Sequence, residues 1–450
     1  MQSDIRILEL EPVFTDEHFR VPLKFGTGVI RAITSLTVRA RVETRSGKVA
    51  DGYGNILLSD IWAFPSAVLS HEVRDEAMRE IAIRFCDMLV TESHFGHPVD
   101  LYMEAKPGLL QIGESVGADL ELGEPVPVLA SLVCSSPADA AIHDAFGRAN
   151  GVCCYDAYGP EFMEHDLSRW CGADFTGRYI SEYILKAYKP QLPVFHLVGG
   201  MDKLTAAEIT DEDPDDGVPV SLDQWIARDG LRCFKVKLRG TDIDWDVART
   251  KEVAEVIQAT YGQLGMEGRF WLSTDSNEMN ESPATVLEYL EKLQSASPLA
   301  FDSLLYLEQP TERDLALHHF DMSEVAAIKP VVVDEGVTDV GKVDLALQLG
   351  WSGVGIKTCK GHSSSLLYVA KALQAGMVLT VQDLTNPGRS LLHSVGFAAR
   401  IDTLMGVECN SRQFIPWSEP DFRSRHQPLF TVTDGNVSTE TIGTSGLGYD

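Results

Sequence analysis

Short apolar runs recur along residues 192–408, and most of them end in a charged residue. The eight runs cover residues 192–198, 231–237, 270–275, 304–308, 330–334, 353–357, 377–383 and 404–408. The intervals between them leave room for a helix and two loops, which a crossover between parallel strands requires. Runs rich in Val, Ile and Leu indicate strands buried on both faces. The pattern predicts an α/β fold, a (β/α)8 barrel with functional groups at the carboxyl ends of its strands.

The first 130 residues show a different order. Apolar and polar positions alternate over residues 29–58 around a turn at Ser46 and Gly47, which predicts an antiparallel hairpin, and helical patterning follows over residues 70–99. Strands followed by helices predict an α+β unit separate from the barrel. We expect the hinge between Pro125 and Pro137, with a helix capped by Ser136 and stopped at Gly147. After Pro416 the apolar runs no longer have the spacing of barrel strands. We expect this C-terminal tail to pack against the N-terminal unit.

Two further segments interrupt the barrel pattern. Residues 155–190 are rich in aromatic side chains without a clean period, which indicates an inserted, partly helical segment. Residues 206–219 hold six acidic side chains after the first barrel strand. This second segment is either a solvated loop or a lid over the barrel mouth.

Length, charge and cysteine content narrow the class of protein. A barrel needs about 250 residues, so a chain of 450 residues has room for a second domain. A net charge of −28 disfavours nucleic acid and anionic membrane surfaces as partners. The eight cysteines include the adjacent pair Cys153 and Cys154, an awkward arrangement for a disulfide framework. With no signal-like start and no run of about 18 apolar residues, we expect a cytoplasmic protein.

Three of the strand ends carry a carboxylate. Asp275, Glu308 and Asp334 each close an apolar run, and the three runs are consecutive. Three carboxylates with open positions beside them suit Mg²⁺, which prefers octahedral oxygen ligands and keeps water or substrate in its shell. Mn²⁺ would also fit. The sequence therefore predicts a magnesium site at the mouth of the barrel.

Three lysines accompany the acids. Lys235 and Lys237 lie two apart in one strand and point to the same side, into the barrel, where an unpaired ammonium group is costly. They either pair with neighbouring acids, or the charge of Lys235 favours the neutral amine of Lys237, which then acts as a base. Lys357 ends the sixth strand, across the barrel from the second. Lys237 and Lys357 would thus face a bound molecule from opposite sides.

These residues together resemble the enolase superfamily, in particular its mandelate racemase and muconate lactonizing enzyme branch. The resemblance rests on the motif Lys235-x-Lys237, the acids Asp275, Glu308 and Asp334, the segments 307–310 and 334–336, Lys357, and the helix 140–147. It implies a capping domain over residues 1–130, completed by the tail 412–450, and a catalytic barrel over residues 131–411. Segments 20–26 and 52–54 resemble loops of that capping domain.

The resemblance implies a reaction type. Members of this family remove the proton α to a carboxylate and stabilise the resulting enediolate with Mg²⁺. Two opposed lysines resemble the muconate lactonizing type, since the seventh strand ends in Gln382 and Asp383 and offers no histidine. We expect a lyase or isomerase acting on a small carboxylate, an acid-sugar dehydratase or a racemase or epimerase, in a homo-oligomer. The alternatives are a cycloisomerase or syn-elimination enzyme, and a non-catalytic metal-binding relative.

Other residues are candidates for supporting roles. Lys360 and His362 stand where muconate-type members commonly carry glycines, so either could share or take over the role of Lys357. The side chains expected to contact substrate or to support the metal ligands are Asn277, Asp383, Glu408 and Tyr53. Asn277 lies two residues beyond Asp275 and is expected to continue its strand and point the same way. A metal-dependent hydrolase on the same barrel is disfavoured, because no strand ends in a His-x-His pattern.

Overall fold

The N-terminal part of the chain is an antiparallel sheet covered by helices. The computed structural model describes residues 1–25 and 28–450. The sheet has the order β1 (Ile5–Phe25), β2 (Gly28–Thr44) and β3 (Val49–Leu57). Its helices are α1 (Asp60–Ala63), α2 (His71–Thr91), α3 (Pro98–Asp119) and α4 (Val128–Asn150). The predicted hairpin is confirmed as β2 and β3, and the additional long strand β1 pairs with β2.

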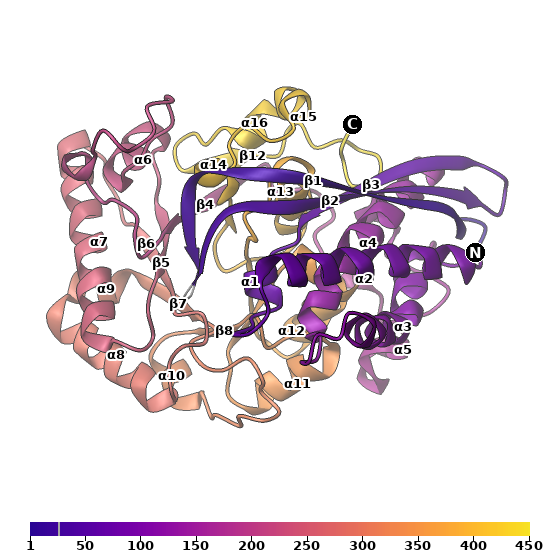
Figure 1. The fold of residues 1–450 in the computed structure, drawn as a ribbon, viewed down its shortest axis with the longest axis horizontal. Coiled ribbons are helices and arrows are strands. Elements are labelled where there is room, and N and C mark those ends of the chain that lie inside the picture. Colours follow the sequence, from indigo (N-terminus) through magenta and orange to yellow (C-terminus); the bar gives the residue numbers. More distant parts are fainter. Residues whose placement is uncertain (26–27) are drawn as a thin grey trace.

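The rest of the chain contains the predicted barrel. Its parallel strands are β4 (Gln191–Val198), β5 (Cys233–Lys237), β6 (Trp271–Asp275), β7 (Leu304–Glu308), β8 (Val331–Val333), β9 (Gly353–Ile356), β10 (Val378–Val381) and β11 (Val407–Glu408). They follow one another in chain order from β4 to β10, and β11 pairs with β4. Beside β11, the N–H of Leu404 donates to the carbonyl of Leu379 in β10 at 2.7 Å. The fold is a (β/α)8 barrel with an N-terminal α+β unit (Figure 1).

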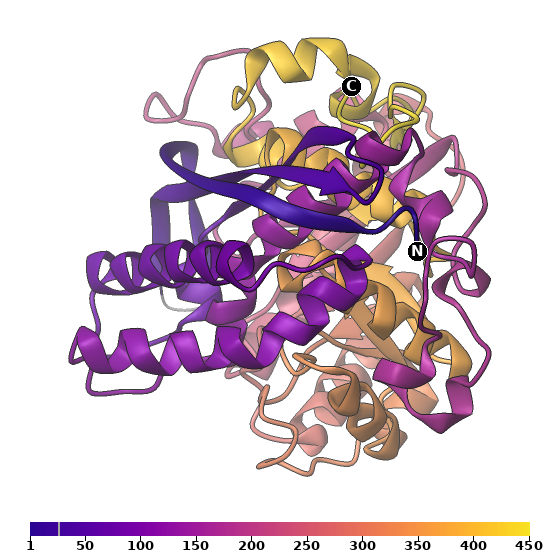
Figure 2. The same cartoon turned by 90° about the vertical axis from the view of Figure 1, so that its right-hand side faces the viewer.

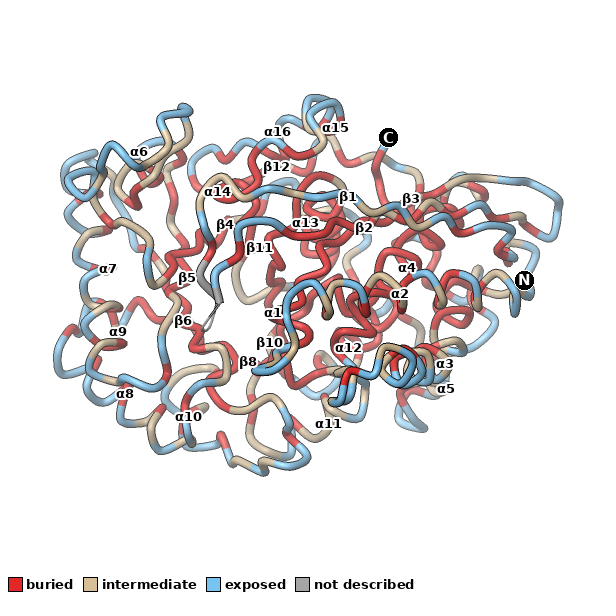
Figure 3. The backbone as a smooth tube through the Cα atoms, in the orientation of Figure 1, coloured by how far each residue is buried: buried red, intermediate tan, exposed pale blue. Residues whose placement is uncertain are grey.

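Helices alternate with the barrel strands. The principal ones are α6 (Leu222–Asp229), α7 (Ile243–Leu264), α8 (Pro283–Ala296), α9 (Pro298–Ser303), α10 (Ser323–Ile328), α11 (Val340–Gln348), α12 (His362–Gln374) and α13 (Gly388–Ala399). Residues 155–190 hold only short helical turns, among them η1 (Cys154–Ala157) and α5 (Ser168–Cys171), as expected for a partly helical insertion. Figure 3 shows buried backbone at the centre of the molecule and exposed backbone along the outer helices.

The prediction for the helix at the hinge was wrong at both ends. α4 begins at Val128, eight residues before the expected cap at Ser136, and it continues to Asn150 with Gly151 as its left-handed cap. Pro137 therefore lies inside the helix, where it has no N–H to donate to the carbonyl of Val133. The hydroxyl of Ser136 donates to that carbonyl instead, at 3.0 Å. This replacement explains why the helix runs through a proline that sequence patterning treats as a start.

Both segments expected to be loops were also assigned wrongly. Residues 20–25 lie in β1, while Gly26 falls outside the described residues, and residues 52–54 lie in β3. The glycines of β3 serve close packing. A Cβ on Gly54 would lie 2.1 Å from the carbonyl oxygen of Pro137, and a Cβ on Gly52 would lie 2.2 Å from the nitrogen of Ala145. The glycines let α4 lie directly on the strand.

The N-terminal sheet extends over the barrel. Pairing between β1 and β2 is interrupted between His18 and Leu23, and in this stretch β1 reaches the barrel side. The ring of Phe19 lies 6.0 Å from that of Phe414, in α14 (Ser411–Phe414). The guanidinium of Arg20 donates to Asp216 at 2.6 Å and to the carbonyl of Val218 at 2.6 Å. Figures 1 and 2 show β1 and β2 crossing from the N-terminal helices toward the barrel.

The C-terminal tail contacts both parts of the chain. It contains α15 (Pro420–Arg425), α16 (Gln427–Phe430) and β12 (Asn436–Ser438), and β12 pairs antiparallel with the start of β4. Further on, Leu447 N–H donates to Asp144 Oδ1 in α4 at 2.8 Å. The tail thus joins the first barrel strand to the N-terminal unit. None of the helices in the described ranges has the length and apolarity needed to span a bilayer, and all eight cysteines are buried and unpaired.

Candidate active site

Strand β5 places Lys235 and Lys237 on one face, because successive side chains of a strand alternate. The ammonium of Lys235 is buried and donates to Glu308 Oε1 at 2.7 Å and to Glu408 Oε1 at 2.9 Å. Asp275 Oδ2 lies 3.1 Å from the same nitrogen. Burial alone would lower the pKa of Lys235, but the three carboxylates raise it well above its ordinary value. Lys235 is therefore a fixed positive charge at the centre of the acid cluster.

Lys237 lies at the open end of the same strand. Its ammonium donates to Asp275 Oδ2 and, at 3.2 Å, to Asn277 Oδ1. We expected Asn277 to continue the strand, but β6 ends at Asp275 and Asn277 has a φ of 47°, in the left-handed region. Its N–H donates to Asp275 Oδ1 at 2.7 Å. Asn277 thus reaches the site from a turn, and it holds both the lysine and the aspartate.

Asp334, just after β8, lies between two lysines. Lys357 Nζ is 2.6 Å from Asp334 Oδ2, and Lys360 Nζ donates to Asp334 Oδ1 at 3.0 Å and to its carbonyl at 2.5 Å. Although burial alone would raise the pKa of Asp334, the two ammonium groups lower it to about 2. Lys357 lines the site cavity, whereas Lys360 does not. Lys360 is therefore placed to hold Asp334 and not to share the position of Lys357.

Two residues that sequence reasoning missed complete this side of the site. Trp62, in α1, lies with its ring centroid 4.4 Å from Lys357 Nζ, and its indole N–H donates to Glu335 Oε1 at 2.7 Å. Glu335 is buried, and burial together with the charge of Asp334 raises its pKa. Segment 334–336 of the sequence contains Glu335, but no role was expected for its side chain. No local signal links Trp62 to the barrel.

Glu408 ends β11, as expected, and Asp383 lies two residues beyond the end of β10. The backbone N–H groups of Asn386 and Asn410 donate to the two oxygens of Asp383 at 2.7 and 2.6 Å. Burial raises the pKa of Asp383 to about 7 despite these bonds. The backbone N–H of Asp383 donates to Glu408 Oε2 at 3.3 Å. Both carboxyl groups face the site cavity.

One small cavity connects these side chains. Its volume is about 40 Å³, room for no more than a few water molecules. The polar wall comes mostly from the barrel. Its barrel residues are Lys235, Lys237, Asn277, Lys357, Asp383, Thr385, Glu408 and Asn410, and the N-terminal unit adds Ser59. The apolar wall consists of Phe19, Leu23, Ile30, Ile33, Trp62, Leu197 and Leu384. Most of this apolar wall comes from the N-terminal unit.

Two candidate residues lie away from the cavity. Tyr53 is in β3, where its N–H donates to Asp144 Oδ2 at 3.0 Å and its ring lies 5.4 Å from the guanidinium carbon of Arg389. His362 begins α12 and is buried in a chain of hydrogen-bonded rings. Neither side chain lines the cavity that holds the lysines. Sequence position alone could not show this, since His362 is only five residues beyond Lys357.

The charges of the site suit a divalent cation. The carboxyl groups outnumber the ammonium groups by two: they belong to Asp275, Glu308, Asp334, Glu335, Asp383 and Glu408, against Lys235, Lys237, Lys357 and Lys360. Burial and the charge of Asp275 raise the pKa of Glu308 well above its usual range, despite Lys235. In the described part of the chain, Glu308 Oε2 and Asp334 Oδ2 contact no donors other than the ammonium groups of Lys235 and Lys357, each at 2.6 Å.

The donor set therefore fits a hard cation such as Mg²⁺, for which carboxylate oxygens are the preferred ligands. As the side chains stand, however, no three His, Cys, Asp or Glu residues in the described ranges have the spacing of a metal site. The ammonium of Lys235 lies between Asp275 and Glu308. A cation at this place would have to replace those ion pairs.

Solved structures of similar shape cover nearly the whole chain. A mandelate racemase/muconate lactonizing protein from Herpetosiphon aurantiacus has a TM-score of 0.60 and 16% identity, covering 98% of this chain and 97% of that chain. An L-Ala-D/L-Glu epimerase from Bacillus subtilis gives 0.60 and 16%, covering 98% of each chain. A dipeptide epimerase from Enterococcus faecalis V583, complexed with Mg and the dipeptide L-Leu-L-Tyr, gives 0.61 and 15%, covering 98% and 99%.

No protein-family profile and no curated protein sequence matches this chain. At identities this low, a shared fold establishes the architecture only. The chemistry has to be inferred from the residues of the site. The likeness covers 98% of this chain, and therefore both the barrel and the N-terminal sheet. This chain has the fold of the mandelate racemase/muconate lactonizing proteins.

Proposed function

We propose that the protein belongs to the mandelate racemase/muconate lactonizing family of the enolase superfamily and removes the proton α to a carboxylate. The observation that carries this proposal is the position of Lys237 and Lys357. Both line one cavity. They come from the second and sixth of eight barrel strands or the residue that follows, and therefore from opposite sides. A substrate carbon between them has a nitrogen on each face.

A divalent cation is part of the proposal. Asp275, Glu308 and Asp334 would hold Mg²⁺, and the cation would stabilise the negative charge that develops on the substrate carboxylate. The excess of buried carboxyl groups supports this assignment. One of the similar structures is complexed with Mg and a dipeptide, and another, from Bradyrhizobium, with magnesium and mandelic acid.

The lysines divide the proton transfers between them. Lys237, in its neutral form, takes the α-proton on one face, and Lys357 delivers a proton on the other, which inverts the carbon. Asn277 orients Lys237 through its 3.2 Å hydrogen bond. Trp62 lies against Lys357 and shields it from solvent. Both lysines are thus held on the two sides of the reacting carbon before substrate arrives.

The cavity wall points to the kind of substrate. An acid sugar carries several hydroxyl groups that need polar partners, and the wall from the N-terminal unit offers the apolar side chains of Phe19, Leu23, Ile30 and Ile33. We therefore favour a racemase or epimerase of a small carboxylate with an apolar group over a dehydratase of acid sugars. Substrate must displace these side chains, since the cavity measures only about 40 Å³.

The same wall supports the proposed domain division. Residues 1–130 with the tail 412–450 form the capping domain, and residues 131–411 form the catalytic barrel. In this division the cap selects the substrate and the barrel carries out the chemistry. We further propose a homo-oligomer as the assembled form.

Proton exchange with solvent tests the proposed reaction. The protein is incubated in D₂O with Mg²⁺ and a set of α-substituted carboxylates, including N-acyl amino acids, dipeptides and acid sugars. We expect deuterium at the α-carbon of an apolar member, and no exchange after removal of the metal. A 2-keto product from an acid sugar would instead establish a dehydratase. Absence of exchange and of product across the set, with no Mg²⁺ binding, would contradict the proposal.

A further inference from the structure

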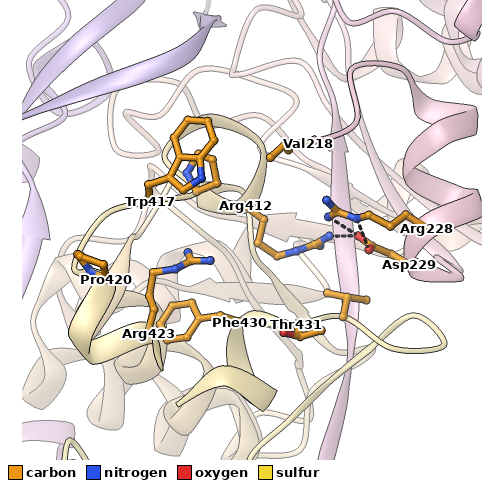
Figure 4. A pocket seen from close by; sticks show the side chains of 11 residues that line it. Val218, Arg228, Asp229, Arg412, Trp417, Pro420, Arg423, Phe430 and Thr431 are labelled. Carbon is orange, nitrogen blue, oxygen red and sulfur yellow. Dashed lines mark hydrogen bonds and ion pairs between the residues drawn. The ribbon is translucent and has the colours of Figure 1, made fainter. Parts of the chain in front are cut away.

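A second cavity lies outside the barrel mouth and differs in charge from the rest of the molecule. Its volume is about 520 Å³, within the range of small-molecule sites. It is lined by Val218, Arg228, Asp229, Arg412, Pro416, Trp417, Pro420, Arg423, Phe430, Thr431 and Val432. It shares no lining residue with the cavity that holds the lysines. Figure 4 shows three arginines approaching it from α6, α14 and α15.

The positive charge of this cavity is only partly compensated. Arg228 and Arg412 both pair with the carboxylate of Asp229, and this is the only acidic side chain in the lining. Arg423 has no carboxylate within ion-pair distance among the described residues, and its guanidinium lies 4.8 Å from the ring centroid of Phe430. Three guanidinium groups thus share one carboxylate. Two positive charges remain in a protein whose net charge is −28.

One of the arginines has an unused donor. Arg412 is 4% exposed, and its buried Nη1 has no hydrogen-bond partner among residues 1–25 and 28–450. Burial of an unsatisfied charged donor is costly. A shift of the Arg412 side chain toward the cavity would let an acceptor there relieve this cost. Desolvation and the nearby charge of Arg412 lower the pKa of Arg423, consistent with two cations held close together. A bound oxyanion would accept a hydrogen bond from the unsatisfied donor and would reduce the repulsion between Arg412 and Arg423.

The remaining walls are flat and apolar. Trp417 is 57% exposed, an unusual position for a large aromatic side chain, and Phe430 closes the opposite end beside Arg423. Figure 4 shows the indole of Trp417 away from the ion pair between Arg412 and Asp229. An exposed indole at the rim of a cationic cavity offers a stacking surface for a planar group.

We propose that this cavity, which we call the arginine pocket, binds a small anion in which a phosphate or carboxylate group is joined to a planar ring. The oxyanion accepts hydrogen bonds from Arg423 and, after a shift of the side chain, from Arg412 Nη1, and the ring packs against Trp417. Arginine favours both groups through its forked donors. This site is separate from the proposed reaction, and its occupancy does not depend on the metal ligands.

Calorimetric titration of the metal-free full chain tests the arginine pocket. The probes are phenyl phosphate, benzoate and inorganic phosphate at low salt. We expect one phenyl phosphate or benzoate per chain, with the stronger of the two identifying the oxyanion. Arg423→Gln removes one charged donor without breaking an ion pair, and should weaken binding at least about tenfold. Added salt should weaken binding in the wild type.

Two further variants separate the parts of the proposal. Trp417→Ala alters only an exposed side chain and should weaken phenyl phosphate or benzoate while leaving inorganic phosphate unchanged. Arg425→Gln, on the same short helix but outside the lining, is the matched control and should bind as the wild type does. Equal affinity in the wild type and Arg423→Gln would overturn the proposal, because it would place the probe elsewhere, including at Lys237 and Lys357. So would the absence of binding by every probe at about 10 mM.

Discussion

At the scale of single residues, the site is a balance between carboxylates and ammonium groups. The sequence predicted that Asp275, Glu308 and Asp334 lie together at the mouth of the barrel, because a strand end fixes both the position and the direction of a side chain. It could not reveal that Lys235 pairs with three acids, since Glu408 is 173 residues away. The same limit hid Trp62. Contacts across the barrel form because the sheet closes, and no local sequence pattern predicts which residues make them.

Replacement of Lys235 tests this balance. Lys235→Met leaves the carboxylates of Asp275, Glu308 and Glu408 buried together without their ammonium partner. Removal of one member of a buried ion cluster costs about 3–5 kcal/mol, so the metal-free variant should unfold at a lower temperature. Mg²⁺ should raise the unfolding temperature of the variant more than that of the wild type, because the cation meets no competing ammonium there.

The control for this comparison is Lys292→Met. Lys292 pairs with Asp244 and Glu288 at the surface, and its loss should leave both the stability and the response to Mg²⁺ nearly unchanged. Equal Mg²⁺ responses in Lys235→Met and the wild type would argue against a cation site among these acids.

At the scale of elements, the apolar rhythm predicted the eight barrel strands, and turn chemistry predicted the β2–β3 hairpin. It failed where tertiary packing overrode local signals. Proline and serine within α4 suggested a helix start, and the resemblance suggested a loop at residues 52–54, which lie in β3. Contacts in the folded chain explain both residue choices. Gly54 lets α4 pack directly on β3, and the hydroxyl of Ser136 donates to the carbonyl of Val133, for which Pro137 has no N–H.

Gly54→Ala tests the contact between β3 and α4. The new methyl group would lie 2.1 Å from a backbone oxygen, so strand or helix must shift, and we expect a loss of about 1–3 kcal/mol in the free energy of unfolding. Gly262→Ala is the matched control, since Gly262 is exposed within α7 and a Cβ there meets nothing within 4 Å. That change should stabilise by about 0.5–1 kcal/mol. Urea unfolding measures both, and an undiminished stability of Gly54→Ala would contradict the packing described.

A chain of buried rings joins α4 to the barrel helices α12 and α13. Tyr158 links His143 to His362 through bonds of 2.8 Å, and His362 Nδ1 lies 2.8 Å from His393 Nε2. Burial, with a smaller contribution from His143, lowers the pKa of His393 to about 3. The folded protein therefore binds fewer protons than the unfolded chain below about pH 6.5. His393 contributes stability that is present above this pH and is lost as pH falls toward 3.

His393→Gln should change this pH dependence. The variant lacks one group that must be held neutral, so between about pH 6 and pH 3.5 its stability should fall less steeply than that of the wild type, by about 1.4 kcal/mol per pH unit. Chemical denaturation at a series of pH values provides the slopes. His319→Gln, at an exposed position, should keep the wild-type slope. Parallel curves for His393→Gln and the wild type would show that His393 does not remain neutral.

At the scale of the whole molecule, the N-terminal unit and the barrel meet over the lysines. Chain length and the order of the predicted elements indicated two domains, and the resemblance implied a cap, but neither showed which side chains meet at the cavity. The acidic segment 206–219 looked like a solvated loop or a lid. In the structure Arg20 of β1 holds it through Asp216 and the carbonyls of Val218 and Pro219. A loop of the barrel is thus fastened to the unit that supplies the apolar wall.

Arg20→Ala should release this segment. Limited proteolysis with a glutamate-specific protease reports on it, because the segment contains Glu208 and Glu212. We expect cleavage there to become several-fold faster than in the wild type, since local opening no longer breaks the bonds of Arg20. Arg6→Ala, which removes an exposed ion pair with Glu43, is the control. Unchanged cleavage in Arg20→Ala would mean that other contacts hold the segment.

The central claim is that Lys237 and Lys357 transfer protons to and from the α-carbon of the substrate on its two opposite faces. The most direct measurement follows α-deuterium incorporation in D₂O, by NMR, into each stereoisomer of the substrate separately, for the wild type, Lys237→Ala and Lys357→Ala. We predict that the wild type exchanges both isomers, and that each variant loses exchange of one isomer by about 10²–10⁴-fold while retaining some exchange of the other. Loss of exchange of the same isomer in both variants, or wild-type exchange in either one, would contradict the assignment.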